Sequence, residues 1–241
     1  MLRSLVGSEM CIRDRYKGMW EDFSDTVGFW ADMENPYITY DNNFIESVWW
    51  ALKQIWDKGL LYKGFKIVPY CPRCGTPLSA QEVAQGYKDV KERSAVVRFK
   101  VKGEDAYILA WTTTPWTLPS NVALCVNPDE DYVKVTSKGY TYYMAAALVD
   151  TVLGEGAEIL EHYQGKDLEF KEYEPLFPYA EKRIGNKKAY YVVCDTYVTL
   201  TDGTGVVHIA PAFGEDDSKV GHRYDLPFVQ LVNEKGEMTE E

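Results

Sequence analysis

Residues 106–121 read AYILAWTTTPWTLPSN, and the β-rich part of the chain can be traced outward from this stretch. Residues 106–112 predict a strand whose apolar run ends at Trp111, and Pro115 stops the strand after three consecutive threonines. Successive strand residues face opposite ways, so the threonines would set hydroxyls and backbone N–H groups around a small space. Such a space suits a carbonyl, a ribose hydroxyl or a water, although the strand propensity of threonine is the plainer explanation.

Short β-type runs continue on either side of this stretch, punctuated by glycine, proline and asparagine. They cover residues 95–101, 122–126, 131–136, 140–144, 188–193 and 206–209. Residues 145–153 predict a short helix, and residues 66–78 a short strand followed by a tight turn. Residues 41–59 show the clearest helical spacing, with Asn43 as the expected cap and Gly59 just past the end. A helical first quarter therefore precedes a β-rich body.

A second constellation lies at residues 202–217, DGTGVVHIAPAFGEDD. Two glycines before a short strand indicate positive φ or a close backbone approach. His208 ends that strand and three carboxylates follow, which would make one imidazole wall and one carboxylate able to hold an ammonium. The alternatives are a satisfied, half-buried histidine and acidic residues that favour a helix N-terminus.

The segment Cys71-Pro-Arg-Cys74 has the shape of half a zinc knuckle. No second pair of ligands stands at matching spacing, so Cys71 and Cys74 give at most a half site for a metal. A redox pair is a rival, but Pro77 follows too soon for the helix that such a pair usually opens. Two reduced thiols in a loop is the simplest explanation.

Composition limits the function classes. The 241 residues carry a net charge of −11, and 14% of them are aromatic. The acidity argues against a surface that is basic throughout and coats nucleic acid, but not against a local nucleic-acid site. No apolar run approaches the ~18–20 residues of a membrane span. Five scattered cysteines do not form a secreted disulfide framework, so a cytoplasmic location is expected.

The two constellations together resemble a known family. WTTTPWTLPSN at 111–121 and GTGVVHIAPAFGEDD at 203–217 resemble the editing domain of isoleucyl-tRNA synthetases, and residues 19–64 and 70–83 resemble other parts of the same enzymes. The resemblance implies an α+β fold: a distorted β-barrel editing domain with peripheral helices, preceded by a helical fragment of a Rossmann-type catalytic domain. The implied reaction is hydrolysis of valine misattached to the isoleucine tRNA, because one methylene is too small a difference for a single site to reject.

The resemblance also assigns residues and boundaries. Catalytic roles fall to Thr112, Thr113, Thr114, His208 and Asp217, and substrate binding to Trp111, Trp116, Gly205 and Phe213. The threonines would position the ribose and the water, His208 would exclude isoleucine, and Asp217 would bind the α-ammonium. Expected parts are a foreign leader at 1–15, a catalytic-domain fragment at 16–69, a cysteine-knuckle connector at 70–87, the editing domain at 88–235 and a truncated tail at 236–241.

Cofactors and partners follow from the same resemblance. Neither a HIGH-type nor a KMSKS-type motif is found, so ATP and Mg²⁺ belong only to the catalytic site of the parent enzyme. Editing is expected to need no cofactor, and zinc would be completed only in the full-length parent. The expected partners are the 3′ end of tRNA(Ile) carrying valine and the remainder of the synthetase, with no membrane and as a monomer.

Two alternatives remain open at this level. An aromatic-rich β module could bind RNA or carbohydrate through ring faces without catalysis. The fragment could also be intact yet inert without the rest of the synthetase. Residues 86–105 carry six basic and four acidic groups, a mild excess that predicts weak, salt-sensitive tRNA binding.

Overall fold

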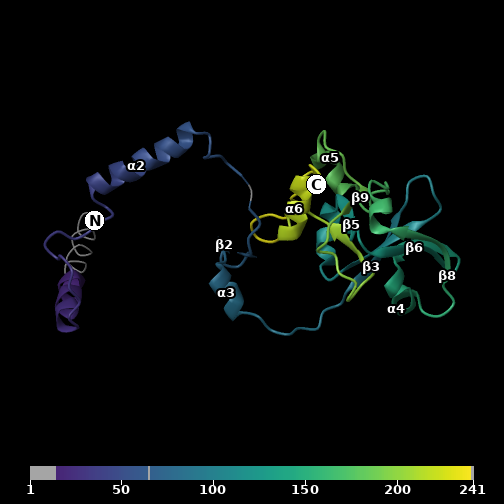
Figure 1. The fold of residues 1–241 in the computed structure, drawn as a ribbon, viewed down its shortest axis with the longest axis horizontal. Coiled ribbons are helices and arrows are strands. Elements are labelled where there is room, and N and C mark those ends of the chain that lie inside the picture. The colour runs from purple at the N-terminus through teal and green to yellow at the C-terminus, as the bar shows by residue number, and fades with distance from the viewer. Residues whose placement is uncertain (1–14, 65, 240–241) are drawn as a thin grey trace. The chain divides into compact units, whose positions relative to one another are not determined.

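The computed structural model describes residues 15–64 and 66–239 (Figure 1). The chain divides into two units, Met1–Gly64 and Phe65–Glu241. The domain boundaries expected from the sequence are finer than this division and stay predictions.

The first unit is helical in its described part. Residues 15–26 form a helix and α2 spans Asn42–Asp57. The expected cap at Asn43 is wrong: the carbonyl of Asp41 already accepts the first intrahelical bond, from the Ile45 N–H, so Asp41 is the N-cap. Gly59 does follow the helix with a φ of 69°. None of the residues of α2 is buried, because a helix cannot cover its own apolar stripe.

The second unit opens with a small ribbon. β1 (Tyr70–Cys71) pairs antiparallel with β2 (Thr76–Pro77), which confirms the predicted strand and tight turn. A short helix, α3 (Ala80–Gln85), follows and begins with a reciprocal capping box between Ser79 and Glu82.

A mixed eight-stranded sheet forms the body of the second unit. Its strands are β3 (Ala95–Lys100), β4 (Tyr107–Thr112), β5 (Ala123–Val126), β6 (Asp131–Ser137), β7 (Tyr140–Ala145), β8 (Glu158–Gln164), β9 (Tyr191–Cys194) and β10 (Val206–Ile209). The connecting helices are α4 (Val149–Leu153), α5 (Glu181–Ile184) and α6 (Glu215–Arg223), with 3₁₀ turns η1 (Pro115–Ser120), η2 (Ala146–Leu148), η3 (Gly165–Leu168) and η4 (Pro178–Ala180). The sheet order is β8-β6-β7-β4-β10-β5-β9, with β3 on the other edge of β4.

Strand β4 pairs with three other strands of this sheet. β3 pairs antiparallel along the whole of one edge, whereas the other edge is shared: β7 pairs in parallel near Tyr107, and β10 pairs in parallel at Trp111. On one side of β4 the sheet continues as a curled group of three strands, the wing (β7, β6 and β8). On the other side it continues as the strands of the candidate site.

Two backbone hydrogen bonds connect the end of β3 with β9 through residues 172 and 173. The N–H of Lys102 donates to the carbonyl of Glu172 (3.0 Å), and the N–H of Tyr173 donates to the carbonyl of Tyr190, the residue before β9 (2.9 Å). Segment 172–173 therefore links β3 to β9, and the predicted distorted barrel with peripheral helices is confirmed as a curled, barrel-like sheet. The Rossmann character of the first unit stays a prediction.

Two apolar clusters lie on the two sides of the central strands. Phe99, Leu124 and Tyr173 belong to the first, while Val122 and Ile209 pack with Val220 of α6 in the second. All residues of β5 and β9 are buried, as expected for parallel strands covered on both faces. No helix of the described residues has the length and apolar content needed to cross a membrane.

Candidate functional site

The threonine stretch folds into a tight, self-bonded turn at the end of β4. Thr112 is buried, and its Oγ1 accepts a hydrogen bond from the backbone N–H of Thr114 (3.0 Å). The hydroxyls of Thr112 and Thr114 lie 3.4 Å apart, and Pro115 then starts η1. The turn gathers hydroxyl groups, while Thr113 stays exposed.

Thr117 connects this turn to His208. Its hydroxyl donates to the carbonyl of Thr114 (2.8 Å) and lies 3.0 Å from Nε2 of His208. A hydroxyl has one proton, so both bonds are made only if Nε2–H of His208 is the second donor. Burial lowers the pKa of His208 to about 4, which keeps the ring neutral, and its buried Nδ1 has no hydrogen-bond partner among the described residues.

Asp217 approaches from the first turn of α6. Its Oδ2 accepts the backbone N–H of Ala210 (2.9 Å), which folds the carboxylate back over the helix start. A Cβ on Gly214 would lie 2.9 Å from Cγ of Asp217, so the glycine makes room for this arrangement. Burial raises the pKa of Asp217 to about 6, although the Ala210 N–H opposes the shift. The carboxylate is thus ionised above that pH but poorly solvated, which favours pairing with a cation.

These groups line one pocket of about 250 Å³. Its lining includes seven of the residues expected from the sequence: Trp111, Thr112, Thr113, Thr114, His208, Phe213 and Asp217. The other lining residues are Thr117, Val207 and Gly214. Sequence reasoning missed Thr117 and Gly214. The spacing of Thr117 three residues after Thr114, across a turn that starts with proline, was an available signal for the first.

The remaining expected binding residues lie elsewhere. Gly205 lines an adjoining pocket of about 240 Å³ that shares Trp111 and Val207 with the first. Its φ is 72°, and a Cβ there would lie 2.3 Å from Cβ of Ala145, which confirms the predicted close approach. Trp116 is 57% exposed and lines neither pocket.

Cys71 and Cys74 lie in the β1–β2 ribbon, one half-buried and the other exposed. Their thiols could supply two ligands to a metal. Within residues 15–64 and 66–239, however, no group of three or more histidine, cysteine, aspartate or glutamate side chains is placed to hold one. The donors described do not make a complete zinc site, so the half site stays a prediction.

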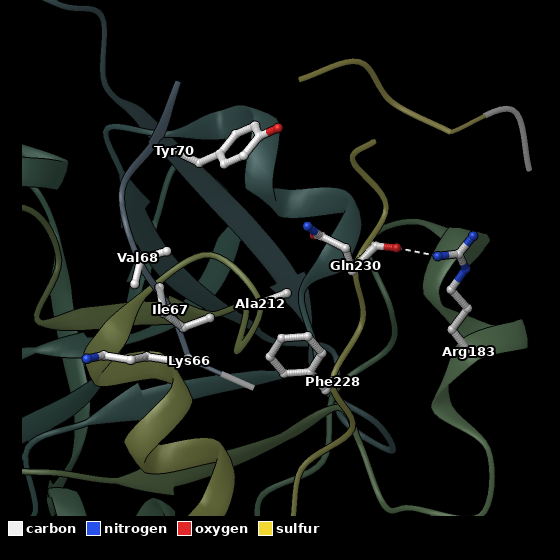
Figure 2. Close-up of a pocket in the computed structure, with 8 residues that line it drawn as sticks. All are labelled: Lys66, Ile67, Val68, Tyr70, Arg183, Ala212, Phe228 and Gln230. Carbon is white, nitrogen blue, oxygen red and sulfur yellow. Dashed lines mark hydrogen bonds between the residues drawn. The ribbon is translucent and has the colours of Figure 1, made fainter. Parts of the chain in front are cut away.

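A larger hollow of about 540 Å³ is lined by other residues, among them Ala212. Figure 2 shows the strip 66–70 on one side of it, Ala212 and Phe228 facing that strip, and Gln230 accepting a hydrogen bond from Arg183. Its lining is mixed, with Ile67 and Val68 beside Lys66. It holds no cluster of catalytic groups comparable with the threonine–histidine–aspartate pocket.

Comparison with known families gives one match over most of the chain. The family described as "tRNA synthetases class I (I, L, M and V)" matches residues 8–208. The chain is also similar to the isoleucine–tRNA ligases of Clostridium acetobutylicum, at 60% identity, and Clostridium novyi, at 56% identity. Each match covers 94% of this chain.

The match covers only part of those relatives. The chain spans 22% of the length of either ligase. Among solved structures, the editing domain of the P. knowlesi cytosolic leucyl-tRNA synthetase superposes with a TM-score of 0.44 at 15% identity, over 58% of this chain and 66% of that chain.

Proposed function

The chain belongs to the class I tRNA synthetase family, and on that premise we propose that it carries the hydrolytic editing site of an isoleucine–tRNA ligase. The substrate would be tRNA(Ile) carrying valine on its terminal adenosine. The observation that carries the proposal is the single pocket that unites four threonines, a neutral buried histidine and a poorly solvated carboxylate.

Asp217 is the group suited to the α-ammonium of the misattached amino acid. A carboxylate has several lone-pair sites, so it can keep the Ala210 N–H and still receive a cation. An ammonium would also replace part of the solvation that burial removes. Glu215 and Asp216 are exposed and pair with Lys219, so they are not candidates for this role.

The threonine turn is suited to the ester and the attacking water. The water oxygen would bond to the ester carbonyl carbon, and the bond from that carbon to the ribose oxygen would break. Free valine and an unesterified ribose hydroxyl would result. Hydroxyl and backbone donors of residues 112–114 would stabilise the oxyanion that forms on the carbonyl oxygen.

His208 is assigned to shape rather than to proton transfer. A histidine with a pKa near 4 is a weak base at neutral pH. Held by Thr117, the ring forms a fixed wall of the pocket, and a wall can reject the extra methylene of isoleucine.

The rest of the assignment concerns the parent enzyme. We expect editing to need no cofactor, and ATP and Mg²⁺ to serve a catalytic site outside this chain. The remainder of the synthetase would hold the body of the tRNA, with the parent a cytoplasmic monomer. Zinc would require ligands beyond Cys71 and Cys74.

The test compares two substrates and two matched variants. The chain is incubated with Val-tRNA(Ile) and with Ile-tRNA(Ile), and release of each amino acid is followed. Selective loss of valine is expected, abolished by Asp217→Ala and kept by Asp216→Ala. Equal release of both amino acids, or no release, would remove the proposal.

A further inference from the structure

Three tyrosines cluster on one face of the sheet, away from the candidate pocket. Tyr107 on β4 and Tyr140 and Tyr142 on β7 have ring centroids 6.2 to 6.5 Å apart. Tyr107 and Tyr142 are register partners in parallel strands, so their side chains share a face, and Tyr140 lies two residues from Tyr142 on the same face. Tyr140 is 46% exposed.

Two cations lie over these rings. The guanidinium carbon of Arg98 is 4.9 Å from the ring centroid of Tyr140 and 5.5 Å from that of Tyr107, and Nζ of Lys100 is 4.7 Å from the Tyr107 centroid. The β3–β4 register puts both cations on the face of Tyr107. Arg98 is exposed, and the carboxylate that pairs with Lys100, Asp105, has a fully exposed side chain. A bound phosphate could therefore replace that carboxylate at little cost.

The same face leads to the candidate site. Trp111 lies four residues after Tyr107 on β4, so both side chains point to the same side, roughly 13 Å apart at ~3.3 Å per residue. Trp111 lines the candidate pocket. A distance of that order corresponds to a few nucleotides, since stacked bases rise ~3.4 Å each.

We propose that this tyrosine cluster, together with Arg98 and Lys100, binds the unpaired nucleotides that precede the 3′ end of the RNA substrate. The proposal rests on the proposed function, which places that end in the pocket. Exposed aromatic rings stack with any base, and guanidinium planes do the same while their charge attracts phosphate. The patch is a local positive feature on a chain whose net charge is −11. The patch therefore favours RNA, which is a polyanion, over a protein partner whose surface carries few acidic groups.

Direct binding tests the cluster without any chemistry. The 241-residue chain is titrated against a short 5′-labelled single-stranded RNA ending in CCA, and fluorescence anisotropy gives the Kd. Tyr140→Ala is expected to weaken binding roughly ten-fold, the size of one lost stacking contact, and Tyr140→Phe to keep it. Arg98→Ala should weaken binding and reduce its salt dependence.

Tyr179→Ala is the matched control, because Tyr179 is equally exposed (48%) and stacks on Phe177, not on this cluster. It should leave the Kd unchanged. The proposal is overturned if Tyr140→Ala binds as tightly as the parent chain, or if Tyr179→Ala weakens binding to the same extent. It is also overturned if a blunt RNA duplex, whose bases are already stacked, binds as tightly as the single strand.

A second measurement separates this proposal from the proposed function. In the deacylation of Val-tRNA(Ile), Tyr140→Ala should raise KM and leave kcat unchanged, because the cluster holds RNA and does not touch the ester. A fall in kcat with unchanged KM would contradict the role. If the chain releases no valine at all, the proposed function fails, while the RNA titration still decides whether the cluster binds single strands.

Discussion

The hydroxyl of Thr117 lies 3.0 Å from Nε2 of His208, although 91 residues separate them in the sequence. The contact joins the η1 turn after β4 to strand β10. It fixes the tautomer and the orientation of an imidazole that burial keeps neutral. Thr117 is therefore a positioning residue for the wall that His208 forms.

Thr117→Val should remove this support while conserving shape. Loss of the partner leaves a buried ring nitrogen unsatisfied, so we expect roughly a ten-fold fall in kcat/KM for Val-tRNA(Ile). We also expect a smaller preference for valine over isoleucine, because a loose ring no longer holds the wall in place. Thr117→Ser should restore both values. Unchanged selectivity in Thr117→Val, measured by parallel deacylation of the two substrates, would contradict the positioning role.

Asp217→Asn should stabilise the protein at neutral pH while abolishing deacylation. The pKa of Asp217 is about 6 in the folded state against 3.8 for the free group, so folding favours the protonated form. Its contribution is favourable at low pH and is lost as pH rises through about 6. Urea unfolding at pH 7.5 should give the variant about 1–3 kcal/mol more unfolding free energy than the parent chain.

The difference should shrink towards pH 4, where the aspartate is protonated in the folded state. Subtracting parent from variant at each pH cancels the opposite contribution of His208, whose pKa is lowered by burial and which therefore costs stability as pH falls. Equal unfolding free energies for the two proteins at pH 7.5 would show that burial of the Asp217 carboxylate does not destabilise the fold.

Gly214→Ala tests the room that Asp217 needs. The φ of Gly214 is −139°, which any residue can adopt, so the added methyl acts only through contact. That methyl would lie 2.9 Å from Cγ of Asp217 and displace the carboxylate from the pocket. We expect KM for Val-tRNA(Ile) to rise several-fold with less than about 1 kcal/mol change in stability. Gly86→Ala is the control, since the nearest atom there would be 3.6 Å away. A KM equal in both variants would refute the steric argument.

The sequence predicted the elements with strong local patterns and missed those that depend on partners. Strands β4, β5 and β10 follow apolar runs that turn residues delimit, so the expected and observed bounds nearly coincide. β8 was missed because its sequence, EILEHYQ, is largely polar and exposed, and only pairing with β6 makes it a strand. Tertiary context decides such a segment more than propensity does.

The site residues divide in the same way, into those that a motif indicates and those whose role depends on the surrounding structure. Motif resemblance selected the threonines, His208 and Asp217, and the structure brings them to one pocket. Thr117 escaped notice because its importance lies in a contact with a distant strand, and Gly214 because its role is the absence of a side chain. Trp116 carries the same motif signal as Trp111, yet it lies in the 3₁₀ turn η1, where the residue is exposed to solvent.

Glu104→Gln should lower the unfolding free energy, because Glu104 is the centre of an ion-pair cluster outside the site. Glu104 accepts hydrogen bonds from Nζ of Lys171 (2.6 Å), the hydroxyl of Tyr143 (2.7 Å) and Nζ of Lys134 (3.1 Å), which ties the β3–β4 turn to β6, to β7 and to residue 171. Burial alone would raise the pKa of Glu104, but these three donors outweigh it and lower the pKa to about 2. Because the folded pKa lies below the free value of 4.5, the stabilisation is present above pH 4.5 and is lost as pH falls towards 2. After allowance for partial exposure, the variant should lose about 1–2 kcal/mol at pH 7 by urea unfolding.

The loss should diminish by pH 2.5, whereas Glu158→Gln, at an exposed position on β8, should change little at either pH. A loss of equal size at both pH values would mean that packing of the side chain, and not its charge, holds the wing to the barrel.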